Sequence, residues 1–230
     1  MLDLKLPTHR RGFLGSVAAT AATLGLGELV PKPLEAQYDA ASKPAGAGDP
    51  AFEAWLNGIK GKHRQVYDAV EPNDGFALIW SHVFLLTGTQ GYGVPEGDLG
   101  VVVVLRHSAI PIAFGDATWA KYKFGEMFKV NDKSTNAPAV RNVFANIKPG
   151  DLPFPEAAVE KLQASGVRFG VCNMAINFFS MQTAQALGKQ AADVKQEWIA
   201  GLLPGITVVP SGVLAVNGAQ KRGCSYCYAG

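Results

Sequence analysis

A thiol and two basic side chains follow short apolar runs in this 230-residue sequence. Cys172 comes directly after residues 167–171, and Arg106 and His107 come directly after residues 100–105. A cysteine attacks as its thiolate, which is favoured by a helix N-terminus or a nearby cation. We therefore predict that Cys172 is a thiol nucleophile and that His107 and Arg106 assist it. The alternative is that Cys172 is a small buried apolar residue.

Other polar residues follow apolar runs in the same way, and we expect them to bind a ligand. Asn173 comes after Cys172, and His82 comes soon after residues 76–80. Ser211 and Gly212 open a predicted helix, so that their N–H groups could hold a small oxyanion, or Ser211 could be an ordinary helix cap.

A metal site is the third chemical possibility. His82, His107 and Cys172 carry nitrogen and sulfur donors that zinc accepts, but their spacing matches no metal motif. We therefore expect no metal and no other cofactor.

Cys224 and Cys227 form a Cys-x-x-Cys pair near the end of the sequence. No histidine follows them, which excludes covalent haem attachment. They could form a disulfide, remain unpaired, pair between subunits, or serve a redox or metal-binding role. In a regular strand, residues three apart point to opposite faces, so a disulfide would need a local turn.

The elements that position these residues alternate between strand and helix. Asp49 and Pro50 open a first helix, which we expect to continue past Gly58 as far as Val70. Predicted strands cover residues 76–80, 100–105, 167–171, 206–209 and 224–228, with helical stretches between most of them. This order predicts an α/β fold of the doubly wound kind, a mostly parallel sheet with helices on both faces. The candidate residues would then meet in a crevice at the carboxyl ends of the strands.

The N-terminal segment has the pattern of an export signal. Arg10 and Arg11 precede a modest apolar stretch and resemble the twin-arginine motif, which directs already folded proteins to export. We predict a signal peptide over 1–36, cleaved after Ala36, and a flexible linker over 37–49. A single domain over 50–230 follows. The mature protein would be periplasmic or otherwise exported, with no stable membrane span, because the apolar stretch is too short and too weakly apolar.

Composition excludes several classes of protein. The formal net charge is only +2, so the chain carries no electrostatic footprint for nucleic acid. Three cysteines are too few for a disulfide scaffold, and recurring apolar runs exclude wholesale disorder.

Four segments in order resemble the DsrE/DsrF-like sulfur-relay family. They are residues 100–107, 166–173, 203–213 (Leu-Pro-Gly-Ile-Thr-Val-Val-Pro-Ser-Gly-Val) and 220–223, and residues 131–154 read as an insertion or a divergent loop. The resemblance implies a compact α/β domain, assembled as a homo-oligomer. It also implies that Cys172 carries sulfur as a persulfide, received from a sulfur compound or a sulfur-carrying protein.

This chain departs from the cytoplasmic sulfur-relay members in its export signal and in its Cys224–Cys227 pair. Two rival functions therefore stay open. The first is a non-catalytic binding or assembly subunit of the same fold, and the second is a metal-binding accessory protein.

Overall fold

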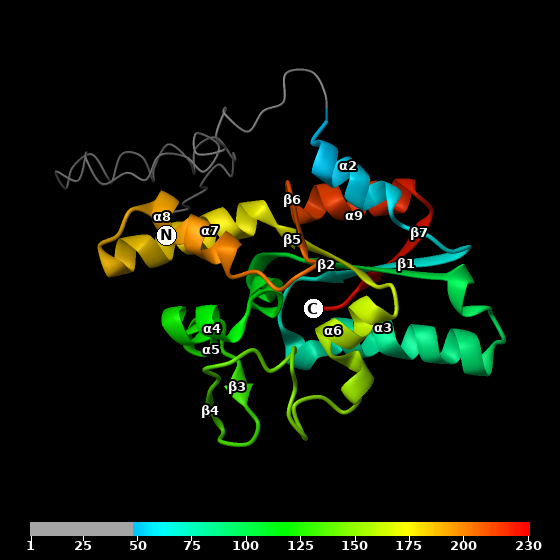
Figure 1. Ribbon diagram of the computed structural model, residues 1–230, viewed down its shortest axis with the longest axis horizontal. Coiled ribbons are helices and arrows are strands. Elements are labelled where there is room, and N and C mark those ends of the chain that lie inside the picture. The colour runs from blue at the N-terminus through cyan, green and yellow to red at the C-terminus, as the bar shows by residue number, and fades with distance from the viewer. Residues whose placement is uncertain (1–47) are drawn as a thin grey trace, which may run out of the picture. The chain divides into compact units, whose positions relative to one another are not determined.

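A five-stranded sheet, parallel throughout, forms the centre of the computed structural model, which describes residues 48–230 (Figure 1). The strand order is β6–β5–β2–β1–β7. The strands are β1 (His63–Ala69), β2 (Leu99–Leu105), β5 (Arg168–Cys172), β6 (Thr207–Val209) and β7 (Cys224–Tyr228). The predicted signal peptide 1–36, with Arg10 and Arg11, lies outside the described residues, and so does most of the predicted linker.

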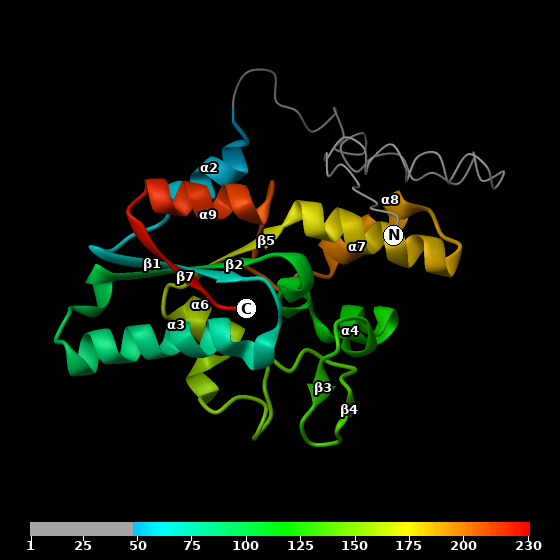
Figure 2. The same cartoon turned by 180° about the vertical axis from the view of Figure 1, so that it is seen from behind.

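Helices cover both faces of this sheet, as the two opposite views show (Figures 1 and 2). Helices α2 (Pro50–Asn57) and α9 (Gly212–Lys221) lie on one face, and α3 (Phe76–Leu86) and α6 (Val159–Ala164) lie on the other. The predicted doubly wound α/β fold is therefore confirmed. No helix within residues 48–230 is long and apolar enough to cross a membrane.

The remaining elements lie near the ends of the strands. Helices α7 (Asn173–Leu187) and α8 (Ala191–Ala200) pack against each other as a hairpin after β5. Helices α4 (Asp116–Tyr122) and α5 (Phe124–Met127) follow the 3-10 segment His107–Ala113, and a short hairpin of β3 (Asn131–Asp132) and β4 (Ala137–Pro138) comes next.

The apolar run of β2 is buried on both sides, as its unbroken valines predict. Val101, Val103 and Leu105 belong to the core between the sheet and α3, whereas Val102 and Val104 belong to the core beneath α2 and α9. Because successive side chains of a strand point to opposite faces, Arg106 continues the row that faces α9. This alternation decides which neighbours Arg106 meets at the end of the strand.

The first strand lies elsewhere than the sequence predicts. Residues 76–80, expected to be a strand, form the first turns of α3, and residues 63–69, expected to continue the first helix, form β1. A short apolar run fits a buried helix as well as a strand, and α3 packs between the sheet and α6. The sequence of β1 lacks the apolar pattern of a buried strand. It begins with His63, Arg64 and Gln65, which keep contact with solvent, and it contains a charged residue, Asp68.

The segment predicted to be an insertion, 131–154, is fixed by buried polar contacts. Arg141 donates two hydrogen bonds to the Asp151 carboxylate, at 2.7 and 2.8 Å, and one to Asp132 at 3.0 Å. The side-chain amide nitrogen of Asn142 donates to the carbonyl oxygens of Ile112 and Phe114, at 2.9 and 2.8 Å. The Arg141 bonds hold parts of the segment together, and the Asn142 bonds attach it to the residues that follow β2.

Candidate functional site

Three of the four predicted strand exits meet at the carboxyl edge of the sheet. Strands β2, β5 and β6 are neighbours, and the register pairs Leu105 with Val171 and Cys172 with Val209. Arg106 and Cys172 therefore follow paired positions on adjacent strands. Ser211 and Gly212 follow β6, so these four predicted residues lie at the carboxyl ends of adjacent strands, as the sequence analysis placed them.

Arg106 is held by a residue that the sequence analysis missed. Its Nε donates to Asp68 Oδ1 at 2.6 Å, and its Nη2 donates to Asp68 Oδ2 at 2.9 Å. Asp68 is only 3% exposed, and it also accepts a hydrogen bond from the Tyr226 hydroxyl at 2.9 Å. The hydrogen bonds to Asp68 raise the pKa of Arg106, against the effect of burial, and Tyr226 and Cys172 raise it further. Arg106 is thus a fixed cation, oriented from the β1 side.

The start of α9 packs directly on Arg106. A Cβ atom at Gly212 would lie 2.5 Å from the Arg106 Cβ and 2.8 Å from its Cδ, so that only glycine fits here without displacement. Ser211 caps the helix, because its hydroxyl accepts a hydrogen bond from the Leu214 N–H at 3.2 Å. The ordinary capping role that we considered for Ser211 is therefore present.

Cys172 sits at the junction of β5 and α7 and takes the place of a helix cap. Its sulfur accepts a hydrogen bond from the Ala175 N–H at 3.4 Å, and Asn173, half-buried, is the first residue of the 15-residue helix. The Cys172 residue is 6% exposed and packs with the larger hydrophobic core. The sulfur therefore lies at the N-terminus of α7.

His107 follows Arg106 in the sequence, but its ring packs against α7. Its backbone has a φ of 48°, in the left-handed region that non-glycine residues rarely adopt. Its ring packs edge-on against Phe179 of α7, with ring centres 6.1 Å apart, and its Nδ1 lies 3.2 Å from the Ser108 hydroxyl. The His107 residue is exposed to solvent.

His82 does not join the site, contrary to the sequence prediction. The prediction placed it after a strand over 76–80, but that segment is helical, so His82 lies in the interior of α3. Its ring packs against Phe154, with ring centres 5.3 Å apart. Within residues 48–230, no three histidine, cysteine or acidic side chains come together as metal ligands, so the proposed set of His82, His107 and Cys172 is not assembled.

Cys224 and Cys227 lie on opposite faces of β7, as a regular strand requires. Cys224 belongs to the core beneath α2 and α9, whereas Cys227 packs against the core on the α3 side, and both thiols are free. Burial raises the pKa of both thiols. The strand geometry thus places the two thiols on opposite faces of β7, without the local turn that an intramolecular disulfide would need.

Asp68 and Tyr226 are the contributors that sequence reasoning missed. The sequence analysis did not select Asp68, because it predicted a helix for that segment. It did not select Tyr226, because the sequence does not show that the final strand pairs with β1. A signal was present in the sequence, since Asp68 stands between Val66-Tyr67 and Ala69-Val70. A charged residue in such a run needs a buried partner.

No protein-family model matches this chain, and no curated protein matches it. Among solved structures, it is similar to a protein of unknown function, MTH1491, from Methanobacterium thermoautotrophicum. The two chains share 18% sequence identity and a TM-score of 0.37, over 72% of this chain and 98% of the other.

Proposed function

We propose that this protein carries sulfur as a persulfide on Cys172, as a member of the DsrE/DsrF-like group. The observation that carries the proposal is the position of the Cys172 sulfur, which caps α7 at the end of β5, the strand next to the one that Arg106 follows. A helix N-terminus and a cation both stabilise a thiolate, which is the form that attacks a sulfur atom. The family-like motifs around residues 166–173 support the same assignment.

The transfer needs no external oxidant. The Cys172 thiolate attacks the terminal sulfur of a donor persulfide, so that a new S–S bond forms as the donor's own S–S bond breaks. The electron pair of the broken bond leaves with the donor as its thiolate. An acceptor thiolate then removes the terminal sulfur from Cys172 by the same step, and Cys172 returns to its starting state.

Arg106 has a free edge for such an anion. Its two hydrogen bonds to Asp68 use Nε and Nη2, and Nη1 donates to no group among the described residues. A persulfide ionises readily, and its terminal sulfur would carry the negative charge. We infer that Nη1 holds this charge while Asp68 and Gly212 keep the guanidinium in place.

Burial of Cys172 supports a second candidate function. A residue that is 6% exposed and packed in the core is typical of a structural cysteine. The protein would then be a non-catalytic binding or assembly subunit, in which Cys172 only completes the core and caps α7. The two candidates differ in one measurable property, which is the reactivity of this thiol in the folded protein.

The test is the intact mass of the folded protein after incubation with glutathione persulfide and removal of excess donor. A persulfide on Cys172 adds about 32 Da, which a reductant removes, and peptide mapping assigns the position. Cys224→Ser and Cys227→Ser are matched controls, because burial raises the pKa of both thiols and leaves them poorly ionised.

We expect both control variants to keep the added mass and Cys172→Ser to lose it. Arg106→Gln should slow loading; because it also leaves the buried Asp68 without its cation, its rate is compared only in protein that circular dichroism shows to be folded. An unmodified Cys172 in a correctly folded protein would refute the carrier function and favour the structural one.

We also propose that residues 1–36 export the folded protein and that the mature form is a periplasmic homo-oligomer. The paired Arg10 and Arg11 support export, and the family likeness supports assembly. Replacing both arginines with lysine should leave the precursor uncleaved in the cytoplasm, whereas a periplasmic product with a new N-terminus would refute dependence on the arginine pair. Light scattering of the mature protein measures its assembly, and a monomeric mass would refute the oligomer.

A further inference from the structure

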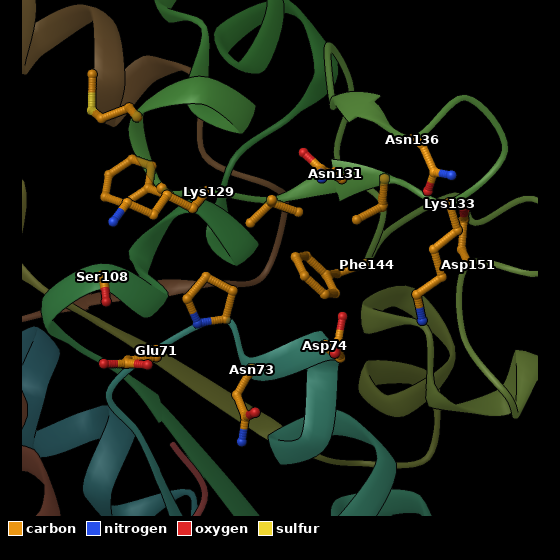
Figure 3. A pocket seen from close by; sticks show the side chains of 15 residues that line it. Glu71, Asn73, Asp74, Ser108, Lys129, Asn131, Lys133, Asn136, Phe144 and Asp151 are labelled. Carbon is orange, nitrogen blue, oxygen red and sulfur yellow. The ribbon is translucent and has the colours of Figure 1, made fainter.

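A pocket of about 590 Å³ opens near the same edge of the sheet, but Cys172 does not line it. One side comes from the segment that follows β1, and the other comes from residues 127–136, between α5 and β4 (Figure 3). Ser108 lines the pocket and lies two residues after Arg106, so the pocket is a neighbour of the Cys172 site and separate from it. The volume is within the range of about 300–1,000 Å³ that small-molecule sites occupy.

The two sides of the pocket carry opposite charges. Glu71 and Asp74 lie on the β1 side, and Lys129 and Lys133 lie on the other (Figure 3). Among the described residues, none of these four side chains forms an ion pair. The other lining acid, Asp151, is already satisfied, because Arg141 and the Lys148 N–H donate hydrogen bonds to it. Four charged groups are thus available to a ligand.

Amide side chains alternate with these charges. Asn73 lies between the two acids in the sequence, and Asn131 and Asn136 flank Lys133. The three side-chain amides make no hydrogen bonds within the described part of the chain. Each offers one acceptor and two donors, which match a peptide group.

The backbone that presents these groups is held in an unusual conformation. Asn73, Asp74, Lys129 and Asn136 have φ angles of 38°, 50°, 56° and 55°, all in the left-handed region. Asparagine and aspartate adopt this region several times more often than other residues, so Lys129 is the unusual one of the four. Residues with a left-handed backbone therefore occur on both the acidic and the basic side of the pocket.

We propose that this pocket binds a short peptide with free termini. The acids on one side would receive its ammonium group, the lysines on the other side would receive its carboxylate, and the asparagines would bind its amide groups. A simple anion would face Glu71 and Asp74, and a simple cation would face Lys129 and Lys133. The arrangement therefore favours a ligand with both charges over a ligand with either one alone.

Isothermal titration of the folded protein with trialanine tests this proposal. The comparison ligands are N-acetyl-trialanine, which lacks the ammonium group, and trialanine amide, which lacks the carboxylate. We expect trialanine to bind at least about tenfold more tightly than either, because each blocked form loses a charge-assisted contact. Equal binding of the three peptides, or no saturable binding of trialanine, would overturn the proposal.

Paired variants sharpen the test. Glu71→Gln with Asp74→Asn should abolish the preference for trialanine over its acetylated form and keep the preference over the amide. Lys129→Gln with Lys133→Gln should do the reverse. Lys161→Gln, at an exposed position of α6 away from the pocket, should change neither preference.

Two further outcomes bear on the proposal. Identical losses in both paired variants would contradict the assigned orientation. Cys172→Ser should bind trialanine normally, because the proposed peptide site is independent of sulfur transfer.

Discussion

Asn142→Ala provides a direct test of how the segment between β3 and α6 is attached. The Asn142 side chain makes three buried hydrogen bonds: its Nδ2 donates to the carbonyl oxygens of Ile112 and Phe114, and its Oδ1 accepts from the Phe144 N–H at 2.8 Å. The residue is 1% exposed, and its three partners are buried too. Truncation to alanine would leave two carbonyl groups and one N–H group without a partner.

The expected loss of stability follows from these three groups. Each unsatisfied buried group costs about 1–3 kcal/mol, so that the sum is about 3–9 kcal/mol. The lower part of this range, about 3–5 kcal/mol, is the better expectation, because a water molecule could enter the vacated space and replace some of the bonds. With a urea slope of about 2 kcal/mol/M, the unfolding midpoint should fall by about 2 M.

Equilibrium urea unfolding followed by tryptophan fluorescence measures this change. Asn217→Ala is the matched control, because Asn217 is exposed on α9, and its free energy of unfolding should change by no more than about 0.5 kcal/mol. A loss below about 1 kcal/mol for Asn142→Ala, with an unchanged slope, would refute the reasoning. The three groups would then have other partners.

Two further predictions concern Gly212 and the acid stability of the protein. Gly212→Ala should lower the free energy of unfolding by about 1–3 kcal/mol, because its Cβ would overlap Arg106, and urea unfolding measures the loss. Hydrogen bonds from Ser134 and the charge of Arg141 lower the pKa of Asp132, while at Asp151 the bonds from Arg141 and Lys148 outweigh burial and lower its pKa. Both acids should therefore contribute stability above pH 4 or so, which is lost as pH falls through their lowered pKa values. Arg141→Met should cost about 2–4 kcal/mol at pH 7, and this cost should shrink below pH 4 or so, because protonated carboxyls no longer need the cation.

The controls for these two predictions are specific. Gly97→Ala should leave stability nearly unchanged, because a Cβ there would meet no atom within 4 Å. An equal effect at Gly97 and Gly212 would show that helix propensity or chain entropy, and not the contact with Arg106, explains the loss. For Arg141→Met, a cost that stays constant between pH 7 and pH 3 would contradict the role assigned to the two carboxylates.

Four of the five strands could be predicted from the sequence because their patterns are unambiguous. The β2 run Gly-Val-Val-Val-Val-Leu has no helical period, and the β6 run is bounded by Pro-Gly and Pro-Ser-Gly. Arg106 follows β2, Cys172 ends β5 and Gly212 comes three residues after β6, so the places of these candidate residues could be predicted as well. Local sequence patterns thus predicted where these candidate residues lie along the chain.

The first strand and its contribution to the site were not predictable in the same way. β1 gains its burial from neighbours on both sides, β2 and β7, which are distant in sequence. Its charged residue, Asp68, is tolerated only because Arg106 and Tyr226 satisfy it, and no local pattern reports such a pairing. The pocket could not be predicted from local patterns either, because its two sides come from segments about 60 residues apart, one with Glu71 and the other with Lys129.

The order of the strands has a consequence for the route by which the protein folds. β2, β5 and β6 can add to β1 one after another on the same side, in their order along the sequence. β6 forms one edge of the sheet and β7 forms the opposite edge, where it pairs with β1. The chain between them must therefore cross the sheet, and the β1–β7 pairing joins residues as distant in sequence as Arg64 and Cys224. We therefore expect an intermediate in which the β1 edge is unpaired, open to association with other chains until β7 closes it.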